Sequence, residues 1–158
     1  MNPCFKIEEL RETRDEAMIT IMGLPDKPGV AARLFRLFAR ESLPVRSIVQ
    51  NCPDAGAANI TFTITMEHFA RASALCREFL SDSVEGLIMD NHIGRILIGG
   101  SDLENSSGLA AFVFETLGEA SINILAIAAE FDSMSFILRG EDMDQAMRLL
   151  RRRFCLTD

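Results

Sequence analysis

Histidines, cysteine pairs and long apolar runs are all scarce in this chain of 158 residues. The only two histidines, His68 and His92, lack the close spacing of paired metal ligands. The absence of any Cys-x-x-Cys pair disfavours a zinc knuckle or a disulfide framework. The four scattered cysteines are Cys4, Cys52, Cys76 and Cys155. We therefore expect reduced thiols in a cytoplasmic protein that holds neither a metal nor a cofactor.

The chain also has fewer basic residues than acidic ones. Lysine and arginine number 16 against 23 acidic residues, which gives a formal net charge of −7. An acidic chain repels phosphate groups, so the composition disfavours nucleic acid or an anionic membrane as a partner. No apolar run is long enough to cross a bilayer, and the polar start MNPCFKIEELRETRDE is not a secretory signal. What remains is a globular protein of one domain or two very small ones.

One basic cluster, Arg148 with Arg151–Arg153, suggests nucleic-acid binding. Arginines are expected near the C-terminus of a helix, because they complement its dipole. An RNA-binding sheet would also carry stacking aromatic residues on a central strand. The strongest strand pattern, Ala58–Met66, has threonines and one aromatic residue, Phe62. The sequence thus predicts no nucleic-acid partner.

No group of residues indicates catalysis. Catalysis needs a base beside a nucleophile or a pair of carboxylates, and Ser106, Ser107, Glu115 and Glu119 have no histidine beside them in the sequence. The acidic residues from Glu8 to Glu16 are interpreted as a solvated segment. We expect a protein that is not an enzyme.

The chain repeats itself, which indicates two copies of one module. Three pairs of segments match at offsets of 77 to 79 residues: Ile19–Gly23 with Ile96–Gly100, Gly29–Phe35 with Gly108–Phe114, and Leu43–Val45 with Ile122–Ile124. Each copy reads as strand, helix, strand, strand, helix. Period-two alternation indicates the strands, and apolar residues at helical spacing indicate the helices.

The patterns place each element by residue. In the first copy we expect strands over Met18–Gly23, Val45–Asn51, Ala58–Met66 and Val84–Met89, with helices from Pro28 and over Glu67–Leu80. In the second copy we expect strands over Arg95–Gly99, Ile122–Glu130 and Ser133–Arg139, with helices over Ser107–Glu119 and Glu141–Phe154. Cys52–Gly56 is read as a turn and Asp90–Gly94 as a short link.

The predicted fold class is α+β. It consists of two ferredoxin-like βαββαβ modules packed together, with helices on one face of antiparallel sheets. We expect residues 1–91 to form the first module together with an N-terminal segment, and residues 92–158 to form the second.

Specific segments carry a resemblance to a known family. ITIMGLPDKPGVAARLF, SIVQN and ITFTI resemble the first ACT domain in the regulatory region of aspartate kinases. GLAA, SINI and the strand Met134–Leu138 resemble the second. The resemblance implies binding of a free amino acid of the lysine or threonine class at interfaces between ACT modules. It also implies a homodimer.

The loop after Gly23 has the chemistry for such a ligand. Backbone amides at a helix N-terminus attract a carboxylate, and Gly29 lets a ligand approach the backbone. Asp26 can pair with an ammonium group, while Gln50 and Asn51 offer donors and acceptors. The predicted ligand-binding set is Asp26, Lys27, Pro28, Gly29, Val30, Ala31, Gln50 and Asn51, to which the resemblance adds main-chain groups of Asn123 and Ile124.

Several alternatives stay open at this point. Asp26 could instead hold the turn or cap the helix. The chain could be a free-standing amino-acid sensor, a regulatory subunit or fragment of an aspartate kinase, or a dimerisation module that has lost its ligand. The partner would then be an aspartate kinase catalytic subunit or another regulated enzyme. The second loop has no acidic residue at the position of Asp26, so we expect one amino-acid site per chain.

Overall fold

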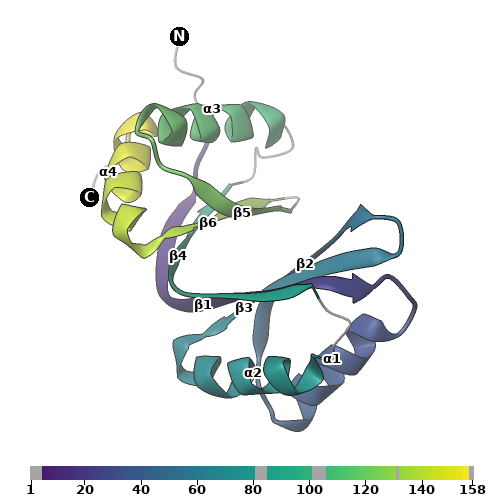
Figure 1. Cartoon of the computed structure of the whole chain (residues 1–158). Coiled ribbons are helices and arrows are strands. Elements are labelled where there is room, and N and C mark those ends of the chain that lie inside the picture. The colour runs from purple at the N-terminus through teal and green to yellow at the C-terminus, as the bar shows by residue number, and fades with distance from the viewer. Residues whose placement is uncertain (1–4, 81–84, 101–105, 131, 157–158) are drawn as a thin grey trace. The chain divides into compact units, whose positions relative to one another are not determined.

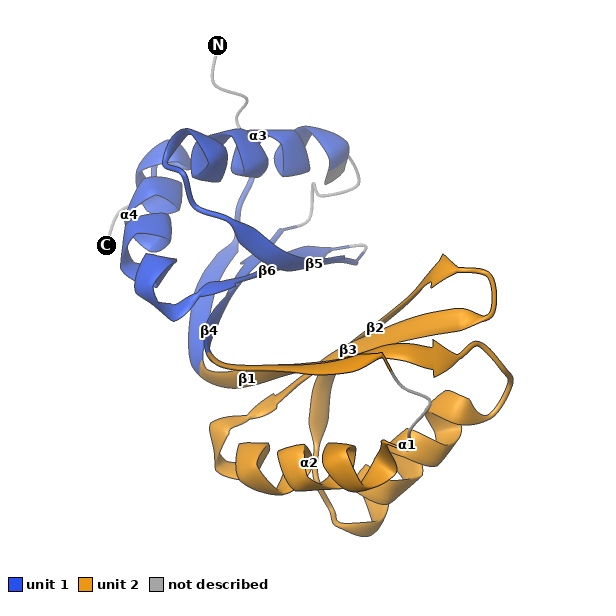
Figure 2. Cartoon of the chain, viewed as in Figure 1, with its two compact units in different colours: residues 1–14, 92–158 blue, residues 15–91 orange. Residues whose placement is uncertain are grey.

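The computed structural model describes residues 5–80, 85–100, 106–130 and 132–156 (Figure 1). The chain divides into two compact units (Figure 2). Unit 2 is Asp15–Asn91, and unit 1 combines Met1–Arg14 with His92–Asp158. None of the helices in the described ranges is long and apolar enough to cross a membrane.

Unit 2 is a sheet covered by two helices. Its elements are the second half of β1 (Glu9–Pro25), α1 (Val30–Arg40), β2 (Val45–Asp54), β3 (Ala57–Thr65), α2 (Met66–Phe79) and the first part of β4 (Gly86–Gly99). The strand order is β2-β3-β1-β4, and the β2–β3 and β1–β3 pairs are antiparallel. Alternate apolar residues of β1 and β3, such as Ile19 and Phe62, point at the helices and form the core with Leu34 and Phe38.

Unit 1 repeats this arrangement. It contains the second part of β4, α3 (Ser106–Glu119), β5 (Ile124–Ala129), β6 (Ser133–Arg139), a 3-10 turn (Gly140–Asp142) and α4 (Met143–Arg153). Its strand order is β1-β4-β6-β5, with Ile96, Phe136 and Leu138 packed against the helices. The predicted pair of ferredoxin-like βαββαβ modules is therefore confirmed.

The N-terminal segment belongs to unit 1, whereas the sequence analysis assigned it to the first module. Glu8 donates its backbone N–H to the carbonyl of Gly99 at 2.9 Å. Ile7 and Leu10 pack against the core of unit 1, and the Phe5 ring lies 5.6 Å from that of Phe112. These apolar residues stand among charges, which hides the strand pattern. As a result β1 begins at Glu9 and not at Met18.

The expected link at Asp90–Gly94 was wrong, because these residues lie inside the continuous strand β4. Gly94 has a packing role there. A Cβ atom at this position would lie 2.5 Å from the sulfur of Met143, a fully buried residue of α4. Glycine thus lets α4 lie close to the strand.

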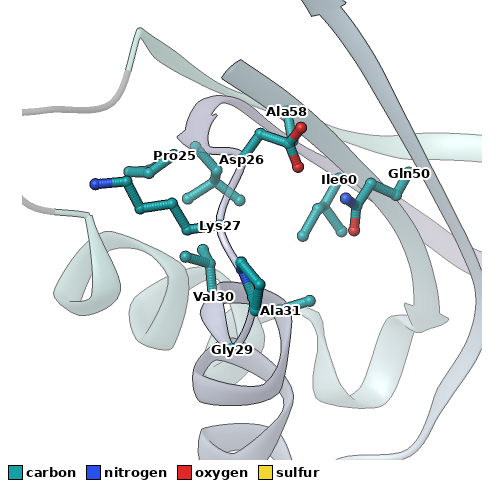
Figure 3. A pocket seen from close by; sticks show the side chains of 11 residues that line it. Pro25, Asp26, Lys27, Gly29, Val30, Ala31, Gln50, Ala58 and Ile60 are labelled. Atoms are coloured by element: carbon teal, nitrogen blue, oxygen red, sulfur yellow. The ribbon is translucent and has the colours of Figure 1, made fainter. Parts of the chain in front are cut away.

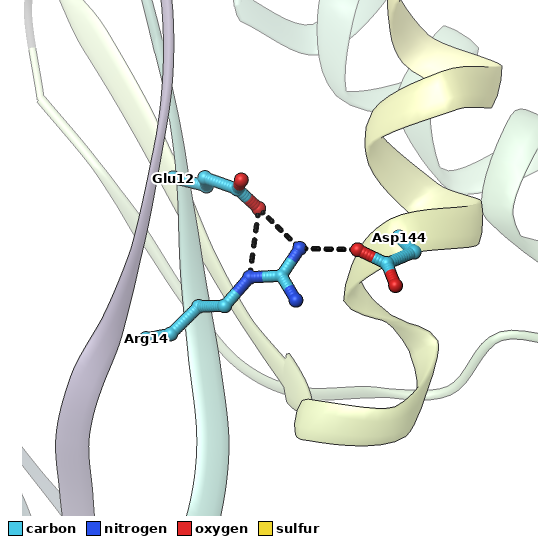
Figure 4. A network of polar contacts seen from close by, with 3 residues as sticks. All are labelled: Glu12, Arg14 and Asp144. Carbon is cyan, nitrogen blue, oxygen red and sulfur yellow. Dashed lines mark hydrogen bonds and ion pairs between the residues drawn. The ribbon is translucent and has the colours of Figure 1, made fainter.

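The acidic segment is also not simply solvated. Glu16 is only 2% exposed, and Arg46 donates to its carboxylate at 3.0 Å. Arg14 lies between Glu12 on the same strand, at 2.9 Å, and Asp144 on α4, at 2.5 Å (Figure 4). The hydrogen bond from Arg14 lowers the pKa of the Asp144 carboxyl. The pair therefore favours the folded state above the ordinary carboxyl pKa and loses this effect as the pH falls.

The two modules also share the backbone conformation at the C-terminal ends of α1 and α3. Ser42 after α1 and Ser121 after α3 both have positive φ, at 54° and 58°. In each module the next residue closes the helix end, because Leu43 N–H bonds to Phe38 O and Ile122 N–H to Leu117 O, both at 2.9 Å. This is the bonding pattern of a Schellman motif, in which glycine is usually preferred.

Replacing Ser121 with glycine should raise the free energy of unfolding by about 0.5–1 kcal/mol, because serine in the left-handed region carries a steric penalty. Urea denaturation of the whole chain measures this. Ser121→Ala is the control, since it keeps the Cβ atom and should bring no gain. Equal effects of the two substitutions would contradict the explanation.

Candidate functional site

A pocket of about 350 Å³ opens in unit 2 beside the loop that joins β1 to α1 (Figure 3). One wall is this loop with the first turn of α1, and the other is formed by β2 and β3. Its lining residues are Leu24, Pro25, Asp26, Lys27, Pro28, Gly29, Val30, Ala31, Gln50, Ala58 and Ile60.

Two hydrogen bonds to neighbouring backbone and side-chain groups hold the start of the loop. At its start Gly23 has φ of +71°, and its N–H donates to the side-chain oxygen of Asn59 on β3 at 3.1 Å. Asp26 then donates its backbone N–H to the carbonyl of Gly56, in the turn between β2 and β3, at 2.9 Å. The pocket is therefore held in shape by β3 and the β2–β3 turn.

The start of α1 is open to a ligand. Gly29 precedes the helix with φ of +93°, and no side chain caps the first turn. A Cβ atom built on Gly29 would have nothing within 4 Å, so the space beside this backbone is empty of protein atoms in the described ranges. The Val30 N–H donates to the carbonyl of Lys27 at 3.3 Å, so the next amides, of Ala31 and Ala32, can donate to an anionic group placed there.

Asp26 is the acidic side chain of the pocket. Its carboxylate does not cap α1, which removes one of the two structural roles considered for it. In Figure 3 the carboxylate lies on the side of Gln50, whereas the ammonium group of Lys27 points away from both. Lys27 can thus serve the pocket through its backbone.

Cys52 on β2 interacts with the same acidic group. The pKa of its thiol is raised by desolvation and by its hydrogen bond to Asp26, against a smaller lowering by Gln50. The thiol therefore stays protonated at neutral pH and donates to the carboxylate.

Seven of the ten predicted ligand residues line the unit 2 pocket, and three do not. Gln50 pairs with Ile60 on the helix side of the sheet. Asn51, the next residue, pairs with Asn59 on the opposite face and does not line the pocket. Asn123 and Ile124 lie in unit 1 and are not among the lining residues.

The sequence analysis missed four apolar residues of the lining. Ala58 and Ile60 were assigned to a strand, and Leu24 and Pro25 stood in the loop without a ligand role, yet all four line the pocket. The antiparallel pairing of β2 with β3 explains why Ile60 lines the pocket, because it sets Ile60 directly opposite the predicted ligand residue Gln50.

The second module differs at the matching position. Gly108 corresponds to Gly29, but ring atoms of Phe5 lie 3.8 and 3.9 Å from a Cβ atom built on it. The N-terminal segment thus approaches the start of α3, where unit 2 has open space. The loop residues 101–105, among them Asn105, lie outside the described residues.

Two segments of the chain match family models, both described as ACT domain, at residues 17–75 and 96–154. The chain belongs to the ACT-domain family. It carries two ACT domains in tandem, as the sequence resemblance indicated.

This ACT protein is similar in sequence to aspartokinases. It is 34% identical over 149 residues to an aspartokinase of Mycolicibacterium smegmatis, an alignment that covers 90% of the chain and 35% of the relative. An aspartate kinase of Pseudomonas putida is 31% identical, again over 90% of the chain and 35% of the relative. The ACT protein thus spans about a third of the length of these curated relatives.

Solved structures of similar proteins match nearly the whole ACT protein. The regulatory subunit of aspartate kinase from Thermus thermophilus, in a ligand-free form, has a TM-score of 0.84 at 25% identity and covers 94% of this chain and 99% of that chain. A chain in the structure of aspartokinase alpha and beta subunits has a TM-score of 0.86 at 26% identity. That match covers 95% of this chain and 99% of the solved one. The ACT protein therefore matches the regulatory region of aspartate kinases.

Proposed function

We propose that this ACT protein senses a free amino acid of the lysine or threonine class and regulates an enzyme of the aspartate kinase type. In this proposal it transfers no phosphoryl group itself. The observation that carries the proposal is the unit 2 pocket, where a carboxylate and uncapped helix amides face one empty space. A zwitterionic amino acid presents the two charges that such a site complements.

The ligand would lie with its two ends in different surroundings. Its carboxylate would accept hydrogen bonds from the amides at the start of α1, beside Gly29. Its ammonium group would pair with Asp26, with Gln50 as a further partner. Ala31 and Ile60 offer apolar contact to its aliphatic part. A volume of about 350 Å³ is within the range of small-molecule sites.

The comparisons support the assignment to a regulatory subunit in particular. Two similar chains, covered over 99% of their length, are described as a regulatory subunit of aspartate kinase and as part of an assembly of alpha and beta subunits. We accordingly propose an aspartate kinase catalytic subunit as partner and a homodimer as the assembled form, in the cytoplasm. Asn51, Asn123 and Ile124 would contribute only if such an assembly brings them to the pocket.

Isothermal titration calorimetry of the full chain with L-lysine and with L-threonine tests the proposal. We expect one of them to bind with about one site per chain, since the start of α3 is approached by Phe5 and the start of α1 is open. The D-enantiomers, which place the ammonium group differently against Asp26, are the controls and should bind at least about tenfold more weakly. Two equal sites per chain would contradict the expected asymmetry. A thermal-shift screen in which none of the twenty amino acids stabilises the chain would favour the dimerisation module.

A further inference from the structure

The outer face of α1 carries an array of arginines over a groove. Arg33, Arg36 and Arg40 are exposed and follow one another at helical spacings of three and four residues. Together with Leu37 of the same helix and Phe79 at the end of α2, they line a groove of about 210 Å³. The guanidinium group of Arg33 lies over the Phe79 ring at 5.6 Å.

In the described part of unit 2 these charges have no acidic counterpart. The helix α1 contains no aspartate or glutamate. Two nearby acidic side chains, Glu41 and Glu78, both face Arg71 instead, at 2.8 and 3.8 Å. Within the described ranges, none of the three arginines of the array forms an ion pair with an acidic side chain.

Such an array repels itself. Like charges three or four residues apart on a helix oppose helix formation, and the helix dipole favours only Arg40, which lies in the last turn. The chain as a whole has a net charge of −7, so this face has the opposite sign to the molecule. A solvated surface helix usually mixes both signs.

We infer that this face is a docking surface for an acidic segment of another protein. Arg40 follows Arg33 by seven positions, a helical rise of about 10 Å. This is longer than one carboxylate or phosphate can span, and it suits several acidic side chains in a row. Leu37 and Phe79 give the floor an apolar part, which a peptide side chain can contact and a bare phosphate cannot.

A nucleic acid fits less well. Its long phosphate backbone would extend beyond a single basic face onto a chain of net negative charge. A protein segment engages the array alone. The inference goes beyond amino-acid sensing and does not depend on it, because the groove and the unit 2 pocket have no lining residue in common.

Fluorescence anisotropy with a short labelled peptide of glutamates around one central leucine tests the inference on the full chain. We expect saturable binding that weakens as the salt concentration rises to about 0.3 M, because exposed charge pairs are screened. The double variant Arg36→Gln/Arg40→Gln should weaken binding about fivefold to thirtyfold. The same peptide with lysines in place of glutamates should not bind.

The chain offers a matched control on another helix. Arg148 and Arg152 of α4 are exposed and have the same spacing of four residues. They differ in that Asp144 lies one turn before Arg148 and interacts with its charge, whereas α1 has no acidic residue. Arg148→Gln/Arg152→Gln removes equal charge and should change peptide affinity less than about twofold.

The following results would overturn the inference: no saturable binding of the glutamate peptide, equal losses in the two double variants, or tighter binding of an RNA oligonucleotide than of the peptide. Calorimetry with lysine and threonine on Arg36→Gln/Arg40→Gln keeps the two proposals apart. Unchanged amino-acid affinity with lost peptide binding separates the docking surface from the amino-acid site.

Discussion

Replacing Asp26 with alanine should weaken amino-acid binding by about ten- to a hundredfold, which corresponds to the loss of one charge-assisted hydrogen bond. Asp26 supplies the negative charge of the unit 2 pocket, and its side chain does not cap α1. The free energy of unfolding without ligand should therefore change by less than about 1 kcal/mol. Calorimetry and thermal melting of both forms measure the two effects.

Two control variants make the Asp26 result specific. Asp54→Ala removes the same charge from an exposed position in unit 2 that does not line the pocket, so affinity should stay within about twofold. Lys27→Ala should behave likewise, because its ammonium group points away from Asp26 and Gln50 (Figure 3). If Asp26→Ala melts at a lower temperature yet gains the same shift from ligand, Asp26 holds the turn and does not bind.

Deleting residues 1–14 should unfold unit 1 and leave unit 2 folded. The deletion removes Phe5, Ile7 and Leu10 from the unit 1 core, together with the strand beside β4. Complete burial of one apolar side chain of this size contributes about 1.5–3 kcal/mol to the free energy of unfolding. These three are partly buried, so we expect a loss of about 3–5 kcal/mol. Against a typical domain stability of about 5–15 kcal/mol, that loss leaves unit 1 marginal or unfolded.

Hydrogen exchange resolves the two units in this experiment. Amides of α3 and α4 should lose protection in the deleted chain, while those of α1 and α2 keep it. The control is Glu9→Gln/Arg11→Gln, which breaks an exposed ion pair of 3.2 Å on the same segment and should alter stability by less than about 1 kcal/mol. Full protection of α3 and α4 after the deletion would contradict the role of the N-terminal strand.

The repeated module could be predicted from the sequence because its signals are local. Apolar alternation marks Ala57–Thr65, and the matched positions of Ser42 and Ser121 adopt the same backbone conformation in both copies. The extent of the long strands could not be predicted in the same way. Glu9–Arg14 carries charge at most positions, and its strand exists because Leu10 contacts the unit 1 core, far along the chain. Asp90–Gly94 was interpreted as a link because glycine is common in turns. In the structure Gly94 lies within β4, where the absence of a side chain makes room for Met143.

Part of the candidate site could likewise be predicted from the sequence, and part of it could not. The loop from Asp26 to Ala31 could be predicted because strand-to-helix junctions with proline and glycine have local chemistry. The choice between Gln50 and Asn51 depends on which face of β2 each residue occupies, and this follows from pairing with β3. The approach of Phe5 to Gly108 joins residues more than a hundred positions apart, and no local pattern indicates it.

The placement of the N-terminal strand has a consequence for how the chain is synthesised. Unit 2 is continuous in sequence and can fold once Asn91 has left the ribosome, whereas the first strand of unit 1 must wait for His92–Asp158. During that interval an unpaired strand could associate with other nascent chains. Charged residues of both signs, among them Glu8, Glu9 and Arg11, stand along this segment, and charged side chains on an unpaired strand oppose pairing with another chain. The same charges that conceal the strand from pattern analysis can thus protect the growing chain from aggregation until its partner strand β4 is complete.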